Sequence, residues 1–256
     1  MTDPAASSVV WLDAIDVAGA LLLGAAYLTA MRHVRARERW PAARAVAFGV
    51  ALGLAAVATS PAVDAHARSS AAWHMGQQMM LLVLVAPALV AGRPLLLARR
   101  ATGRRPGRAP GPVAAWLAFV GIQWMLHIPP VLDGIVRRPF WEGMMHIALV
   151  AAGAMFFAQV IGGGLGRLGN PLLAGIYVAS AMPTTDAIAL WLMLDPHVIY
   201  PAFTGPGALA AQRLAGAIMF GAGNLLLVAA GVVAGRYLWD GNRTTPGRRD
   251  LPGSAA

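Results

Sequence analysis

The chain has 256 residues, of which 58% are hydrophobic and only 12% are charged, and its mean hydropathy is +0.61. A soluble domain carries about 25% charged residues, so this composition argues against an ordinary water-soluble protein and indicates an integral membrane protein. The net charge is +9, but the basic residues, all of them arginine, lie in short connections between apolar runs and not on one face, so no nucleic-acid binding is expected. There is no cysteine, which excludes disulfides and thiolate metal sites and leaves imidazole, thioether and carboxylate as metal ligands.

Seven apolar runs are long enough to cross about 30 Å of hydrocarbon. They cover residues 9–31, 43–60, 72–91, 113–128, 144–162, 171–194 and 208–239. Residues 1–8 lack the basic region of a signal peptide, so the first run is interpreted as an uncleaved span. We therefore expect an all-α polytopic membrane bundle of about seven transmembrane helices, with one domain over residues 1–239 and a disordered cytoplasmic tail over residues 240–256.

The orientation follows from the arginines, because arginine-rich short loops stay on the cytoplasmic side. Most of the 20 basic residues fall after the first, third and fifth runs and in the C-terminal tail. This distribution predicts an N-terminus outside and a C-terminus in the cytoplasm. The lipid bilayer of a bacterial-type cell membrane is then the first partner, while no residue pattern defines an oligomeric state.

The third run opens with Trp73–Met80, which holds one histidine, two glutamines and three methionines before the apolar residues begin. Polar side chains are costly in hydrocarbon, so at such a position they indicate a functional site. His74 and Gln78 are four residues apart and share one face of a helix. In the predicted orientation this end of the run lies at the outer membrane face.

Other helix ends predicted at the same face carry further potential ligands. Glu142 and His146 are also four residues apart, provided that their helix begins by about Phe140. Imidazole suits copper and zinc, and thioether selects Cu(I), so we expect a copper site with Cu(I) favoured. The candidate metal ligands are His74, His127, His146, Met75, Met79 and Glu142.

These candidates have structural alternatives. His127 precedes Ile128 and two prolines that end its helix, so it could cap free carbonyl groups. Methionines in a membrane bundle most often fill gaps in the core. Asp186 lies well inside the sixth run, where it is either a protonated acid bonded to a neighbouring helix or part of a proton or metal path. Gln78, Asp186 and Gln212 are interpreted as supporting polar groups, and Gln212 with Arg213 could instead be an interfacial anchor.

Five segments carry a family pattern in the right order. They are Ser60–Asp64 ahead of Trp73–Met75, Pro87–Pro94, Trp124–Pro129, Ile199–Phe203 and Gln212–Met219. In these segments the chain resembles the polytopic, seven-span CtaG-type cytochrome c oxidase assembly factors. Three positions depart from the family pattern: Gln78 and Glu142 stand where the family has histidine, and Ala211 stands where it has aspartate.

The resemblance implies a non-enzymatic metallochaperone that binds or delivers copper at the extracytoplasmic face during assembly of a haem-copper cytochrome c oxidase. One alternative is a diverged scaffold that has lost the metal and acts through protein contacts with an oxidase subunit. Another is a small proton-coupled or metal transporter that uses Asp186. A metallohydrolase is disfavoured, because Glu142–His146 contains only one of the two histidines of the His-Glu-x-x-His motif.

Overall fold

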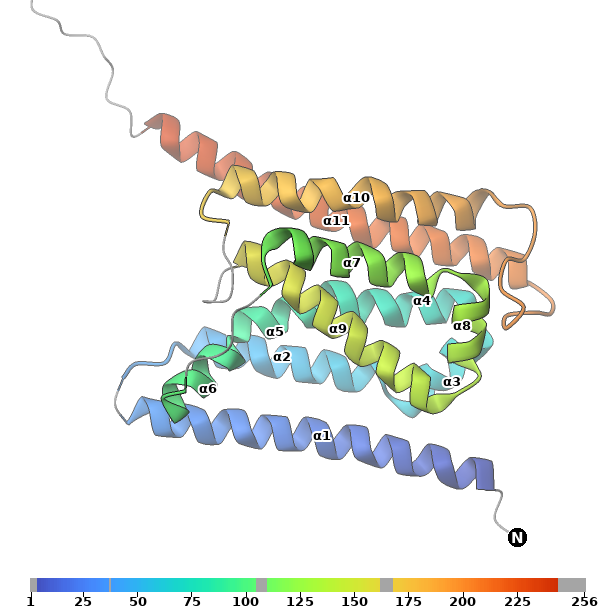
Figure 1. Ribbon diagram of the computed structural model, residues 1–256, viewed down its shortest axis with the longest axis horizontal. Coiled ribbons are helices and arrows are strands. Elements are labelled where there is room, and N and C mark those ends of the chain that lie inside the picture. Colours follow the sequence, from blue (N-terminus) through green and yellow to red (C-terminus); the bar gives the residue numbers. More distant parts are fainter. Residues whose placement is uncertain (1–3, 37, 105–109, 162–167, 244–256) are drawn as a thin grey trace, which may run out of the picture.

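The computed structural model describes residues 4–36, 38–104, 110–161 and 168–243, and every regular element within these ranges is helical (Figure 1). The elements are α1 (Pro4–Arg35), α2 (Ala42–Ala58), α3 (Pro61–Ser69), α4 (Ala71–Met79), the π-helical turn η1 (Met80–Val85), α5 (Ala86–Gly92), α6 (Pro94–Thr102), α7 (Pro112–Leu126), α8 (Pro129–Val136), α9 (Pro139–Ile161), α10 (Pro171–Leu194) and α11 (Ala208–Arg243). The predicted all-α class is confirmed. Of the predicted tail, residues 240–243 belong to α11, and residues 244–256 lie outside the described residues.

Several helices are long and apolar enough to cross a membrane. In the described part of the chain these are Ala71–Thr102, which joins α4 to α6, together with α9, α10 and the segment Ala208–Val228 of α11. Two bent pairs, α2 with α3 at 52° and α7 with α8 at 79°, raise the number from four to six if each pair is one span. The prediction of a membrane helix bundle is confirmed, whereas the count of seven, which includes residues 9–31 inside α1, and the orientation stay predictions.

Prolines explain why short helices follow α2 and α7 where the sequence indicated connections. Proline in the interior of a helix breaks it, because proline has no N–H and its ring clashes with the preceding turn. Its fixed φ angle, however, fits the first turn of a new helix. Pro61 begins α3, and the Ser60 hydroxyl accepts a 3.5 Å hydrogen bond from the backbone N–H of Val63 as its cap. Pro129 likewise lies in the first turn of α8, which has no side-chain cap. The two short helices turn polar residues back over one end of the bundle.

The long helices run back and forth, so alternate connections gather at opposite ends (Figure 1). At the right-hand end in that view lie α3, α8, the starts of α4, α9 and α11, and the end of α10. Helix α6 and the connection between α1 and α2 lie at the opposite end. The end that holds α3 and α8 is where the candidate ligands meet.

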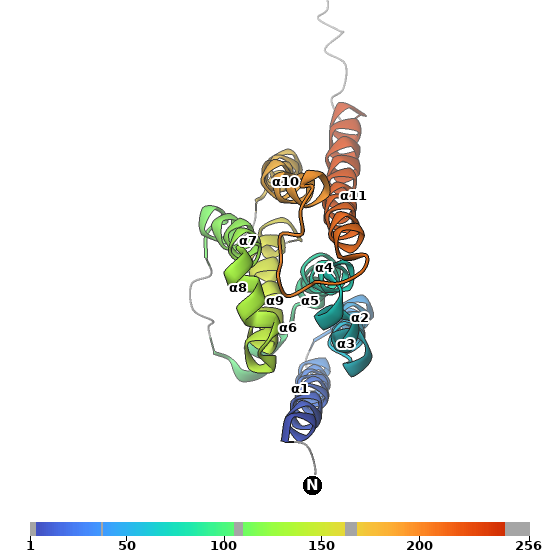
Figure 2. The same cartoon turned by 90° about the vertical axis from the view of Figure 1, so that its right-hand side faces the viewer.

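The continuous helix from α4 to α5 is the centre of the bundle (Figure 2). Along its length it packs against α2, α3, α9 and α11. Close packing with α9 depends on Gly153, because a Cβ atom there would lie 2.7 Å from the Cβ of Ala86 and 2.9 Å from the carbonyl oxygen of Leu82. The widened turn η1 ends two residues before Pro87, which has no N–H to continue the helical ladder.

Candidate metal centre

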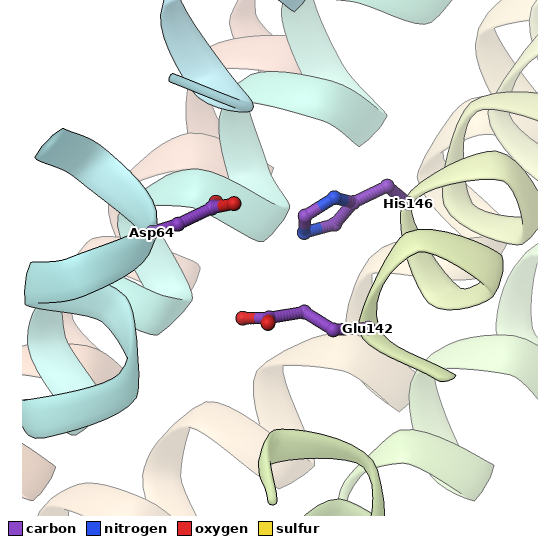
Figure 3. Close-up of side chains that lie close together, drawn as sticks. All are labelled: Asp64, Glu142 and His146. Carbon is purple, nitrogen blue, oxygen red and sulfur yellow. The ribbon is translucent and has the colours of Figure 1, made fainter. Parts of the chain in front are cut away.

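Three buried side chains converge at the end of the bundle that holds α3 and α8. Asp64 comes from α3, while Glu142 and His146 lie one turn apart on α9, and the three point toward one another (Figure 3). One ligand atom from each residue lies within 4.8 Å of the other two. Among the described residues, this is the one group of at least three histidine or acidic side chains with such a geometry. The i, i+4 spacing of Glu142 and His146 therefore places them on one face, as predicted.

A small network of polar side chains holds the two carboxylates in place. The Nε atom of Arg68 donates a 2.8 Å hydrogen bond to Oε2 of Glu142, and its Nη2 atom lies 3.8 Å from Oδ2 of Asp64. The amide of Gln77 donates to Oδ1 of Asp64 and, over 2.8 Å, to the carbonyl oxygen of Ala58 at the end of α2. Two carboxylates thus share one guanidinium, and an ionised site has a net negative charge that favours a further cation.

Within the described part of the chain, two potential ligand atoms of this group have no hydrogen-bond partner. They are Oε1 of Glu142 and Nε2 of His146, in side chains whose residues are only 1% and 6% exposed. Buried polar atoms are almost always satisfied, so an unsatisfied pair in one place needs an explanation. A metal ion bound by imidazole and carboxylate would satisfy both atoms at once.

His74 and Gln78 lie beside this group and bond to each other. The Gln78 amide nitrogen is 2.9 Å from Nε2 of His74 and 3.5 Å from Sδ of Met145, the residue before His146. The amide donates to Nε2, so the proton of neutral His74 is on Nδ1, which is buried and has no hydrogen-bond partner among the described residues.

His127 is placed as the structural alternative describes. It caps α7, and its Nδ1 atom lies 2.7 Å from the carbonyl oxygen of Gln123. Its ring contacts Tyr200 at 6.5 Å between centroids, and Phe203 in the same loop contacts the His74 ring at 5.7 Å. The loop of residues 195–207 therefore lies against both histidines. Burial and the nearby Asp133 carboxylate raise the pKa of Tyr200 well above its ordinary value, so its hydroxyl stays neutral.

Three further candidates are Met75, Met79 and Asp186. Met75 and Met79 are both buried on α4, and Met79 lines an internal cavity. Asp186 is partly buried in α10, next to Gly223 of α11.

Gln212 fixes the 195–207 loop. Its Oε1 atom accepts a 2.7 Å hydrogen bond from the Ile199 backbone, and its amide donates 3.0 Å and 3.3 Å hydrogen bonds to the carbonyl oxygens of His197 and Leu192. Arg213 is exposed. Gln212 is therefore a buried clamp for the loop that covers His74 and His127.

Sequence reasoning did not assign Asp64, Arg68, Gln77 or Met145 to the site. Asp64 lies in one of the family-like segments, but its role depends on the bend between α2 and α3. The available signal was the i, i+4 pair of Asp64 and Arg68 behind Ser60–Pro61, which together predict a separate helix with one charged face.

The whole site lies inside a region shared with known proteins. Residues 25–239 match the model of the family described as cytochrome c oxidase caa3 assembly factor. The chain belongs to this family. The resemblance seen in its sequence motifs is thereby confirmed.

Individual relatives carry little further information. The chain is 28% identical to an uncharacterized protein of Mycobacterium leprae over 76% of its own length, and 25% identical to an uncharacterized protein of Mycobacterium bovis over 60%. The aligned parts are 33% and 26% of those relatives, so the chain spans about a third or less of the curated relatives that it matches. No solved structure matches the chain.

Proposed function

We propose that the chain assists assembly of a haem-copper cytochrome c oxidase by binding copper at the Asp64, Glu142 and His146 group and delivering it at the extracytoplasmic face. Family membership supports the assembly role. The observation that carries the copper proposal is the convergence of three buried side chains, two of which each have a ligand atom with no hydrogen-bond partner among the described residues. In this reading copper is a cargo and the chain is not an enzyme.

The ligand set fits copper better than it fits a hard cation. Oxygen ligands from Asp64 and Glu142, with imidazole from His146, suit Cu(II), whereas imidazole and thioether suit Cu(I). His74 and Met145 supply these softer groups from the adjoining residues. Mg²⁺ and Ca²⁺ take oxygen ligands almost exclusively, so the histidines would be of no use to them.

The position of Arg68 fits a cargo that must be released. An ion bound to Glu142 competes with the guanidinium for the same carboxylate, and the Arg68 side chain keeps 29% of its exposure. A built-in positive charge therefore weakens the site and gives Glu142 a partner when the ion leaves. Binding to a site with such a competitor is reversible, as delivery requires.

Copper content of the purified full chain tests this proposal. In X-ray absorption we expect about one copper per chain with nitrogen and oxygen neighbours in the wild type, as a single site of this kind would bind. The double change Glu142→Gln with His146→Ala is expected to remove this nitrogen- and oxygen-bound copper and to lower oxidase activity in cells. His197→Ala is the matched control, since the side chain of His197 is 87% exposed. Stoichiometric nitrogen- and oxygen-bound copper that survives the double change would refute the site.

A metal-free scaffold is the second candidate, and one observation favours it. Arg68, Glu142, Asp64 and Gln77 already link α2, α3, α4 and α9 without an ion. If the double change abolished copper binding but left oxidase assembly intact, the scaffold reading would replace delivery.

A further inference from the structure

A second group of soft ligands surrounds a cavity inside the bundle. Met79 of α4, Met182 of α10 and Met219 of α11 line it, and we call it the thioether cavity. Gln123 of α7 and Thr185 of α10 complete the polar part of its wall. The volume is about 10 Å³, which is room for one water-sized particle. None of the residues of the candidate metal centre lines it.

The wall of the thioether cavity differs from ordinary apolar packing. Its three methionines are 6%, 3% and 2% exposed, so their sulfur atoms are removed from solvent. Most buried methionines only fill gaps. Here, however, Gln123 and Thr185 also line the wall, and their amide and hydroxyl groups donate hydrogen bonds to the carbonyl oxygens of Phe119 and Met182. The three thioethers therefore remain as potential ligands.

A carboxylate lies on the same side of Gly223 as one of the sulfur atoms. A Cβ atom placed on Gly223, which also lines the cavity, would be 3.5 Å from Sδ of Met182 and 3.7 Å from Oδ1 of Asp186. In the described part of the chain, no side chain forms an ion pair with Asp186. An intramembrane carboxylate without a counterion is costly, and a bound cation would remove that cost.

We propose that the thioether cavity binds one Cu(I) ion through Met79, Met182 and Met219, with Asp186 compensating its charge. This inference rests on the proposed function, because it takes copper as the cargo. Thioether is a soft ligand that selects Cu(I) and binds Mg²⁺, Ca²⁺ and Zn²⁺ poorly. Three neutral sulfur ligands leave the charge of the ion uncompensated in hydrocarbon, and the single negative charge of Asp186 balances it.

The test is X-ray absorption of the full chain in phosphatidylcholine nanodiscs, loaded anaerobically with Cu(I). We expect copper–sulfur scattering in the wild type and a drop of three sulfur ligands in the triple change Met79→Leu, Met182→Leu and Met219→Leu, with at least a tenfold weaker Cu(I) affinity at the cavity. Leucine conserves volume, so the bundle keeps its packing. Met155→Leu is the matched control, because Met155 is a partly buried methionine of α9 that does not line the cavity.

Two further variants keep the inference separate from folding and from the proposed function. If the triple variant does not fold, Met219→Leu alone serves as the test. We expect it to lower the number of sulfur ligands on copper by one. Asp186→Asn keeps the sulfur scattering and weakens Cu(I) binding several-fold. Wild-type copper with only nitrogen and oxygen neighbours, or sulfur scattering unchanged in the triple variant, would overturn the inference.

Glu142→Gln with His146→Ala separates the two copper sites. This variant lacks the candidate metal centre but keeps the thioether cavity, so the sulfur scattering remains. If that variant also loses oxidase assembly, the result supports the proposed function and says nothing about the thioether cavity. Loss of its sulfur scattering would overturn the inference that the cavity is a site of its own.

Discussion

Arg68 balances two buried carboxylates, so its removal has a calculable effect. The change Arg68→Gln removes the guanidinium that pairs with Glu142 and Asp64, which are 1% and 8% exposed. Breaking a buried ion pair from one side costs about 3–5 kcal/mol, and because Arg68 keeps 29% exposure we expect the lower end, about 3 kcal/mol. In copper-free protein this lowers the apparent melting temperature.

Copper should reverse that loss. A ligand that binds only the folded state at 100 times its dissociation constant adds about 2.7 kcal/mol of stability. An ion bound between Glu142, His146 and Asp64 therefore restores nearly all of the stability lost in Arg68→Gln. The affinity for copper also rises, because the competing guanidinium is gone.

The assay is tryptophan fluorescence during thermal unfolding of the detergent-solubilised chain, at a series of copper concentrations. The control is Arg100→Gln, which breaks an exposed pair with Glu38 at 2.6 Å. Exposed pairs contribute about 0–1 kcal/mol, so this variant should behave as the wild type does. The reasoning fails if copper-free Arg68→Gln is as stable as the wild type. It also fails if copper raises the melting temperatures of Arg68→Gln and Arg100→Gln by the same amount.

Three other changes test the geometry. Gln78→His puts a second imidazole between His74 and the α9 ligands, and we expect at least tenfold tighter copper binding in a chelator competition; an unchanged affinity would separate Gln78 from the site. Gly153→Ala forces a Cβ against α5 and should cost about 1–3 kcal/mol of stability, whereas Gly143→Ala, which meets nothing within 4 Å, should not. Gln212→Ala removes the hydrogen bonds that hold the 195–207 loop, so hydrogen exchange there should speed up, while exposed Arg213→Ala leaves it unchanged.

Long apolar elements were predictable because hydrocarbon and capping chemistry fix their ends. The sixth run, predicted at residues 171–194, is helix Pro171–Leu194 in the structure. Proline at its first turn, and the Asn170 side chain accepting a 2.8 Å hydrogen bond from the Leu172 N–H, define its start. Asp195 ends it. Each of these signals is local in the sequence.

The composition of the candidate site was only partly predictable, because its decisive contacts are not local. The spacing of Glu142 and His146 reveals that they share a face, but not that Asp64, which lies 78 residues before Glu142 in the chain, meets them. That meeting depends on the 52° bend between α2 and α3. The contact of Arg68 with Glu142 has the same origin, so helical periodicity alone does not reveal either.

The stretch Trp73–Met80 occupies the boundary between the two proposed sites. On a helix, successive residues are turned by about 100°, so His74 and Gln78 form one face while Met75 and Met79 form the next. The first face contacts α9 through Met145, and Met79 faces the cavity shared with α10 and α11. The nitrogen and oxygen ligands, with the Met145 thioether, therefore belong to one side of this helix and the three thioethers of the cavity to the other. If both sites bind copper, α4 contributes residues to both neighbourhoods, and Gln78→His should change the first site while leaving the sulfur scattering of the second unchanged.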